Sequence, residues 1–287
     1  MNAPDARREP HLPFLASDGR TVIVALDHAL GSGHVAPLDR PEPLLTRVVA
    51  GRPDGLILTP GMARLLGDDH VTPWLMTADY YATSTHPGAT GDAEIHAMAF
   101  GAAGARSRGA AGLKCLLVYG VRDPDRLAAN VAAVARLIDE AHAVGLPVMV
   151  EAVLWGRDIA TSDQRDAALV AHAARAAFEL GADVIKVPLP DDLSAVARLA
   201  EALPVPIVAM GGPASDPAGL FEHLAGAVAA GIRGVALGRN VWQSPDPAAY
   251  TRALRAIVHD ATSAPDALAL LGASGETDAR FEPEAPA

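Results

Sequence analysis

The stretch Ala-His-Ala-Val-Gly-Leu-Pro-Val-Met-Val-Glu-Ala-Val, residues Ala141–Val153, joins a predicted helix to a predicted strand. Its first residues continue an Ala-rich segment of helical spacing, and Gly-Leu-Pro then ends that helix. The apolar, Val-rich run that follows is typical of a buried strand in a parallel sheet. This stretch therefore predicts one helix-to-strand step of an α/β fold.

The same alternation recurs along most of the 287-residue chain. We expect eight strands, at Thr21–Asp27, Gly55–Thr59, Trp74–Thr77, Gly112–Tyr119, Pro147–Val153, Asp183–Val187, Pro206–Met210 and Gly234–Gly238. We expect helices at Pro41–Ala50, Met62–Leu66, Asp92–Arg106, Asp123–Val144, Asp163–Leu180, Leu193–Leu203, Ala218–Ala230 and Pro247–Asp260. Eight such units favour a single (β/α)8 TIM barrel, which takes about 250 residues. An open doubly wound sheet is disfavoured because Asp27–Gly33 lacks the G-x-G-x-x-G pattern.

The predicted barrel domain covers residues 16–265. We expect residues 1–15 to be a flexible N-terminal segment and residues 266–287, which are small and acidic, to be a disordered tail.

Composition excludes several classes of function. The formal net charge of −11 disfavours nucleic acid and anionic membranes as partners, so a phosphate site would have to be local. Cys115 is the single cysteine, and no long apolar segment or export signal is present. These features predict a cytoplasmic protein.

The two lysines are the most informative residues. Of the 23 basic residues all but Lys114 and Lys186 are Arg, and both lysines lie inside apolar, strand-like segments. Burial disfavours the charged form of an amine, and a neutral amine attacks carbonyl carbon. We therefore expect Lys186 to form a Schiff base with a keto group. The alternative for each lysine is a strand-end ammonium that pairs with a carboxylate or binds phosphate.

Two carboxylates and a histidine accompany the lysines. Glu151 lies within an apolar run, where it could shuttle protons, and Lys114 could keep one of the two amines neutral or transfer protons itself. Asp27 ends the first strand and could orient a substrate hydroxyl or act as a base, with a loop cap as its alternative. For His28, a structural hydrogen bond and a role at the substrate are both open.

Glycines follow the seventh and eighth predicted strands, where barrels hold phosphate on backbone N–H groups. Gly211, Gly212 and Gly238 are these glycines, and Arg239 could add a charged contact.

With these segments in place, the chain resembles the class I aldolases of the DhnA type. The matching segments are Val24–His28, Leu113–Tyr119, Gly181–Lys186, Met210–Pro213 and Gly238–Gln243. The resemblance implies that Lys186 forms the imine, that Asp27 and Lys114 belong to the active site, and that the glycines and Arg239 bind phosphate.

The chain departs from the archaeal fructose-bisphosphate enzymes at two points. Val153 stands where those enzymes have a proton-relay tyrosine, and Met210 replaces a serine of the phosphate loop. Glu151 together with the Lys114 strand is more similar to tagatose-bisphosphate and sulfosugar-phosphate aldolases. These departures weigh against fructose 1,6-bisphosphate as the substrate. We also expect Trp155, which follows Val153, to contact substrate.

The leading hypothesis is a metal-independent aldolase, without cofactor, that cleaves or forms a C–C bond in a small phosphorylated, sugar-like ketone. One alternative keeps the imine but transfers an acyl group or condenses two other substrates. A metal-dependent aldolase is disfavoured because the ten His show no ligand spacing. A barrel that binds a phosphorylated metabolite without catalysis is the alternative of another class. We expect a homo-oligomer.

Overall fold

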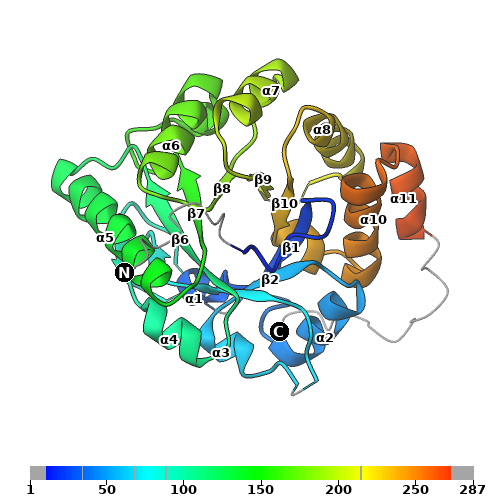
Figure 1. Cartoon of the computed structure of the whole chain (residues 1–287), viewed down its shortest axis with the longest axis horizontal. Coiled ribbons are helices and arrows are strands. Elements are labelled where there is room, and N and C mark those ends of the chain that lie inside the picture. Colours follow the sequence, from blue (N-terminus) through cyan, green and yellow to red (C-terminus); the bar gives the residue numbers. More distant parts are fainter. Residues whose placement is uncertain (1–10, 34, 68, 88, 214, 273–287) are drawn as a thin grey trace, which may run out of the picture.

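A closed barrel of eight parallel strands forms the centre of the chain (Figure 1). The computed structural model describes residues 11–272 except positions 34, 68, 88 and 214. Around the barrel the strands run in the order β1, β10, β9, β8, β7, β6, β3 and β2. Their bounds are β1 Thr21–Ala25, β2 Gly55–Leu58, β3 Trp74–Thr77, β6 Gly112–Val118, β7 Val148–Val153, β8 Val184–Val187, β9 Ile207–Met210 and β10 Gly234–Leu237. The predicted (β/α)8 barrel is confirmed.

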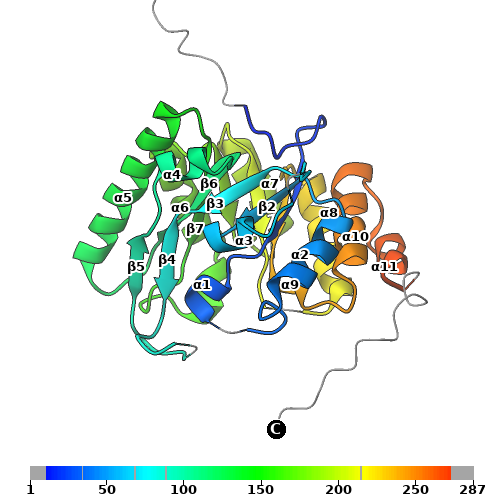
Figure 2. The ribbon, with the colours of Figure 1, turned by 90° about the horizontal axis from the view of Figure 1, so that it is seen from below.

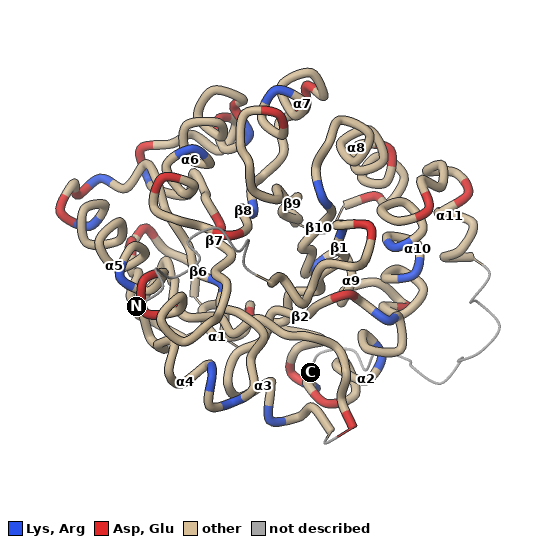
Figure 3. Tube along the Cα trace, viewed as in Figure 1, with Lys and Arg blue, Asp and Glu red and all other residues tan. Residues whose placement is uncertain are grey.

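Helices follow the strands and surround the barrel, so the strands are buried on both faces. They are α1 Ala29–Ser32, α2 Pro41–Ala50, α3 Pro60–Ala63, α4 Ala102–Ser107, α5 Pro124–Ala143, α6 Ala167–Glu179, α7 Leu193–Ala202, α8 Pro217–Ala229, α9 Arg239–Trp242, α10 Pro247–Asp260 and α11 Ala264–Gly272, with a 3-10 turn at Thr161–Arg165. Charged residues of both signs are spread over the outer helices and loops (Figure 3). No helix within the described ranges is both long and apolar enough to cross a bilayer.

The core has two layers. The larger layer lies between the strands and the outer helices, and a smaller cluster fills the barrel interior, with Ile23, Ile57, Met149 and Val208 among its members. Phe14 is fully buried against the interior cluster, and its carbonyl accepts a hydrogen bond from Thr21 Oγ1 at 2.5 Å. Phe14 therefore fills the barrel at the end where the strands begin.

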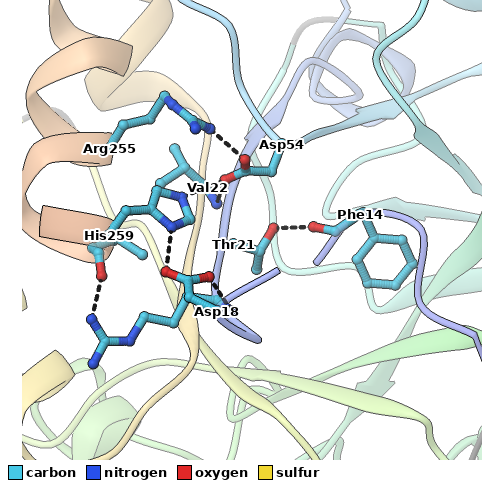
Figure 4. A network of polar contacts seen from close by, with 9 residues as sticks. Phe14, Asp18, Thr21, Val22, Asp54, Arg255 and His259 are labelled. Carbon is cyan, nitrogen blue, oxygen red and sulfur yellow. Dashed lines mark hydrogen bonds and ion pairs between the residues drawn. The ribbon is translucent and has the colours of Figure 1, made fainter. Parts of the chain in front are cut away.

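Polar side chains reinforce that same end of the barrel (Figure 4). His259 of α10 lies between two carboxylates, 2.8 Å from Asp18 and 2.8 Å from Asp54. Asp54 also pairs with Arg255 and accepts the backbone N–H of Val22 at 2.7 Å. This network joins α10 to the segments before β1 and β2.

The structure corrects three predictions. Residues 11–15 are packed through Phe14 rather than flexible, whereas residues 1–10 lie outside the described residues. The domain does not end at residue 265, because α11 continues to Gly272 and packs on α8 and α10; residues 273–287 again lie outside the described residues. The helix predicted at Asp92–Arg106 is wrong in its first half, where β5 (Ile95–Met98) pairs antiparallel with β4 (Asp79–Ala82), and α4 begins only at Ala102.

The hairpin of β4 and β5 contributes to one end of the molecule. Figure 2 shows it on the same side of the barrel as α1 and α9, away from the N-terminal segment. That side carries the carboxyl ends of the barrel strands, where (β/α)8 enzymes hold their active sites.

Candidate active site

A cavity of about 700 Å³ opens at the carboxyl ends of the barrel strands. The structure brings together in its lining all ten residues that the sequence predicted for the site, namely Asp27, His28, Lys114, Glu151, Trp155, Lys186, Gly211, Gly212, Gly238 and Arg239. They come from β6, β7, β8 and the segments that follow β1, β7, β9 and β10. Residues distant in sequence thus share one enclosed volume.

Glu151 lies between the two lysines. Its Oε1 is 2.9 Å from Nζ of Lys186, and its Oε2 is 2.9 Å from Nζ of Lys114. Parallel pairing sets Glu151 beside Lys186 on neighbouring strands and beside Leu116, two residues beyond Lys114, on the other side. All three charged side chains are at most 6% exposed. One buried carboxylate therefore contacts both amines.

Asp27 faces Lys114 from the other direction. Its Oδ2 is 3.5 Å from Lys114 Nζ and accepts a hydrogen bond from Thr77 Oγ1 at 2.6 Å. His28 lies beside it, with Nδ1 3.6 Å from Asp27 Oδ1, and its ring meets Trp242 edge-on at 5.5 Å between centroids. Asp27 is thus held by neighbours on three sides.

The opposite charges in this cluster shift the pKa values of their neighbours. Burial lowers the pKa of Lys114, but the carboxylates of Glu151 and Asp27 outweigh it and hold that pKa well above its ordinary value. Burial raises the pKa of Glu151 and of Asp27, and the nearby cations outweigh this too, so both pKa values are lowered. The opposite charges of Asp27, Lys114 and Glu151 therefore stabilise one another's ionised forms. Lys186 pairs with Glu151 alone among the described carboxylates.

Comparison with known proteins decides the family. The sequence profile of the DeoC/LacD family aldolases matches residues 21–244. The chain belongs to the DeoC/LacD aldolase family. It is 30% identical over 256 residues to 2-amino-4,5-dihydroxy-6-oxo-7-(phosphonooxy)heptanoate synthase of Streptomyces griseus, covering 89% of this chain and 90% of that protein. It is 30% identical over 273 residues to 2-amino-3,7-dideoxy-D-threo-hept-6-ulosonate synthase of Halobacterium salinarum, covering 93% and 97%.

A solved structure agrees with this assignment. The aldolase superposes with a TM-score of 0.74 and 25% identity on an archaeal fructose-1,6-bisphosphate aldolase whose catalytic lysine is covalently bound to the carbinolamine intermediate, covering 86% of this chain and 97% of that one. The predicted class I aldolase, which works through a lysine Schiff base, is confirmed. No group of three or more His, Cys, Asp or Glu side chains is arranged to hold a metal within the described ranges.

One end of the cavity in this aldolase is made of backbone and one guanidinium. Gly211 and Gly212 follow β9, and Gly238 precedes the short helix α9, which begins at Arg239. A Cβ at Gly238 would lie 2.4 Å from Cε1 of His28, so a side chain has no room there. The half-buried Arg239 makes no ion pair with any described residue, and its Nε is buried without a hydrogen-bond partner among them. This end therefore combines the backbone N–H groups of three glycines with a cation.

The β4–β5 hairpin and the loop after β7 bring to the cavity further residues that were not predicted from the sequence. Asp79 and Tyr81 alternate on the cavity face of β4, and Arg157 comes from the loop. The carboxylate of Asp79 is fixed by the N–H of Leu116 at 2.6 Å and by His96 Nε2 at 2.8 Å. Only Asp79 carried a signal in the sequence, since it stands two residues beyond the predicted strand end at Thr77.

Proposed function

We propose that this aldolase forms or cleaves the C–C bond between the carbon next to the keto group and the carbon beyond it in a small phosphorylated ketone, with Lys186 as the residue that forms the imine. The observation that carries the proposal is the contact of Glu151 with both Lys186 and Lys114. That arrangement provides a nucleophile, a group to move protons beside it, and a permanent cation that keeps the carboxylate ionised.

The chemistry follows from these contacts. The amine of Lys186 adds to the keto carbon, and the resulting carbinolamine loses water after its hydroxyl has received a proton through Glu151. The iminium that forms withdraws electrons from the bond between the carbon next to it and the carbon that carries the hydroxyl. In cleavage, the substrate hydroxyl loses its proton, its oxygen becomes the carbonyl of an aldehyde, and the released electron pair forms an enamine on Lys186. Condensation is the reverse. Asp27, fixed by Thr77, orients the hydroxyls.

We place the phosphate of the ketone at Gly211, Gly212, Gly238 and Arg239. The lack of room for a side chain at Gly238 and the unpaired Nε of Arg239 support this placement. His28, against Gly238, and Trp155, on the opposite wall, complete the substrate contacts.

The name of the Streptomyces griseus relative supports a more specific ketone. A heptanoate with a keto group at carbon 6, hydroxyls at carbons 4 and 5 and a phosphonooxy group at carbon 7 has its aldol bond between carbons 4 and 5. Its ketone half then has three carbons and the phosphate. We propose dihydroxyacetone phosphate as the ketone that Lys186 binds in this aldolase.

Trapping tests the proposal. The protein is incubated with dihydroxyacetone phosphate, reduced with borohydride and digested, and mass spectrometry locates the adduct. We expect the adduct on Lys186, and no adduct in a Lys186→Met variant. Attachment to Lys114 instead, or no adduct with this and other small keto phosphates, would contradict the proposal.

We also propose that the protein acts in the cytoplasm as a homo-oligomer. Its buried free thiol, Cys115, is consistent with a reducing compartment. Light scattering during size-exclusion chromatography tests the assembly, and a single-chain mass would refute it.

A further inference from the structure

We propose that Arg157 binds an anionic group, a carboxylate or a phosphate, on the aldehyde substrate of this aldolase. The inference rests on the proposed function, because it concerns the second substrate of the same cavity. Arg157 lines the cavity from the loop after β7, whereas Arg239 lies directly after β10. Since β8 and β9 separate these two strands in the closed ring of eight, the two arginines approach the cavity from nearly opposite sides.

The backbone that carries Arg157 is fixed residue by residue. Gly156 N donates to Tyr119 O, Arg157 N to Glu94 Oε1, and Asp158 N to Gly120 O, at 2.8 to 2.9 Å. A Cβ at Gly156 would lie 1.8 Å from the carbonyl carbon of Gly120, so the two loops are in direct backbone contact. The Arg157 side chain therefore extends from a backbone that hydrogen bonds hold in place at the rim of the cavity.

Two carboxylates adjoin the Arg157 backbone, those of Asp158 and Glu94, and both have other partners. Asp158 pairs with Arg122, whose Nε lies 3.4 Å from its Oδ1. Both carboxylate oxygens of Glu94 accept hydrogen bonds from backbone N–H groups. Oε1 accepts from Arg157 N, and Oε2 accepts from Arg122 N at 3.1 Å. Among the described residues, no side chain forms an ion pair with the guanidinium of Arg157. Its charge and its five donors therefore remain available to a ligand.

The wall around Arg157 suits a small aldehyde with one charged end. The rings of Tyr81 and Trp155, which both line the cavity, lie 5.6 Å apart between centroids and form an apolar surface near Arg157. Burial raises the pKa of Tyr81, so its hydroxyl stays protonated and can donate a hydrogen bond beside Arg157. An aldehyde held there directs its charged end to Arg157 and its carbonyl toward the lysines inside the barrel.

The guanidinium fork recognises carboxylate and phosphate by two parallel hydrogen bonds, and a neutral aldehyde offers no such partner. The experiment therefore compares three acceptors with dihydroxyacetone phosphate as the ketone: glyceraldehyde 3-phosphate, 2-amino-4-oxobutanoate and neutral glyceraldehyde. The variants are Arg157→Met, Arg157→Lys, which keeps the charge without the fork, and Arg175→Met. The last is the control, because it removes an exposed guanidinium that pairs with Glu179 on α6 and does not line the cavity.

We expect Arg157→Met to lower kcat/KM for a charged aldehyde by roughly 10- to 100-fold and to leave glyceraldehyde within about 3-fold of the wild type. Arg157→Lys should recover part of the loss, and Arg175→Met should behave as the wild type. The charged aldehyde with the larger loss identifies the anion as carboxylate or phosphate. Equal losses for charged and neutral aldehydes, or no loss for either charged aldehyde, overturn the proposal.

Borohydride trapping separates this result from a failure of the proposed function. Arg157→Met should give the same Lys186 adduct with dihydroxyacetone phosphate as the wild type, since the ketone does not reach Arg157. If the wild type gives no adduct, the proposed function fails. Calorimetric titration of 2-amino-4-oxobutanoate and of glycerol 3-phosphate then tests Arg157 without turnover, and equal dissociation constants in wild type and Arg157→Met refute its role.

Discussion

Oε1 of Glu151 lies 2.9 Å from Nζ of Lys186, and parallel pairing of β7 with β8 sets the two residues side by side at the same level of the barrel. Both residues stand on buried strands and not on loops, so backbone pairing holds their Cα atoms in register. In the proposed mechanism, a carboxylate in this position exchanges protons with the oxygen bound to the carbon that Lys186 attacks.

Replacing Glu151 by Gln tests this role. We expect Glu151→Gln to lower kcat about 10²- to 10⁴-fold, because dehydration of the carbinolamine loses the carboxylate that passes a proton to its hydroxyl. Borohydride should still trap the ketone on Lys186, but more slowly. Stopped-flow kinetics and timed trapping measure the two effects, with exposed Glu179→Gln as the control. Full activity in Glu151→Gln would assign the proton transfer to another group.

Removing Lys114 should change the pH dependence of activity. Lys114 is the cation that most lowers the pKa of Glu151 against the effect of burial, so Lys114→Met should raise that pKa. The carboxylate is then protonated at a higher pH, and the acid limb of the kcat profile should move upward. Lys114→Arg keeps the charge and should leave the limb near its wild-type position. An acid limb that stays in place in Lys114→Met would show that it does not report Glu151.

The sequence alone could locate the central chemistry for a physical reason. Lys114, Glu151 and Lys186 are charged residues in apolar runs, and a buried charge at a strand end of a barrel must find partners at the same edge. Which lysine pairs with two carboxylates could not be predicted, because it depends on the approach of Asp27 to Lys114 across the barrel.

The remainder of the cavity depends on contacts between distant segments. Residues Ile95–Met98 form a strand because they pair with Asp79–Ala82, and Asp79 is bound to Leu116, so helix-like local spacing does not decide their structure. Arg157 is placed by hydrogen bonds to Glu94 and by contact of its loop with Gly120. Neither relation leaves a periodic pattern in the sequence.

The network at the opposite end of the barrel predicts a pH-dependent stability. The pKa of His259 is raised, chiefly because Asp54 accepts a hydrogen bond from its ring. Asp18 accepts a second hydrogen bond, and burial only partly opposes the two. A raised folded-state pKa means that the stabilisation is fully present below the unfolded value near 6.5 and is lost as pH rises through the folded value.

The variant His259→Gln should therefore lose about 1 to 2 kcal/mol at pH 6 and less at pH 9. Thermal unfolding of both proteins across this range measures the difference. The control is His86→Gln, at an exposed position. A difference in Tm that is constant with pH would show that His259 does not carry the charge in this network.

Asp79 should connect the stability of the hairpin to activity. Its buried carboxylate accepts the N–H of Leu116 and contacts His96, so Asp79→Ala leaves a buried donor unpaired and should lower the free energy of unfolding by about 2 to 3 kcal/mol. Because Tyr81 follows two residues later on the same face of β4, the substitution should also raise KM for the aldehyde more than for the ketone. His96→Ala keeps the bond to Leu116 and is the matched control, with a smaller loss of stability.

Urea unfolding measures the loss of stability in Asp79→Ala and His96→Ala, and steady-state kinetics measure the change in KM. Equal losses in Asp79→Ala and His96→Ala would mean that the bond to Leu116 does not hold the hairpin, and unchanged kinetics in Asp79→Ala would remove the hairpin from the substrate site.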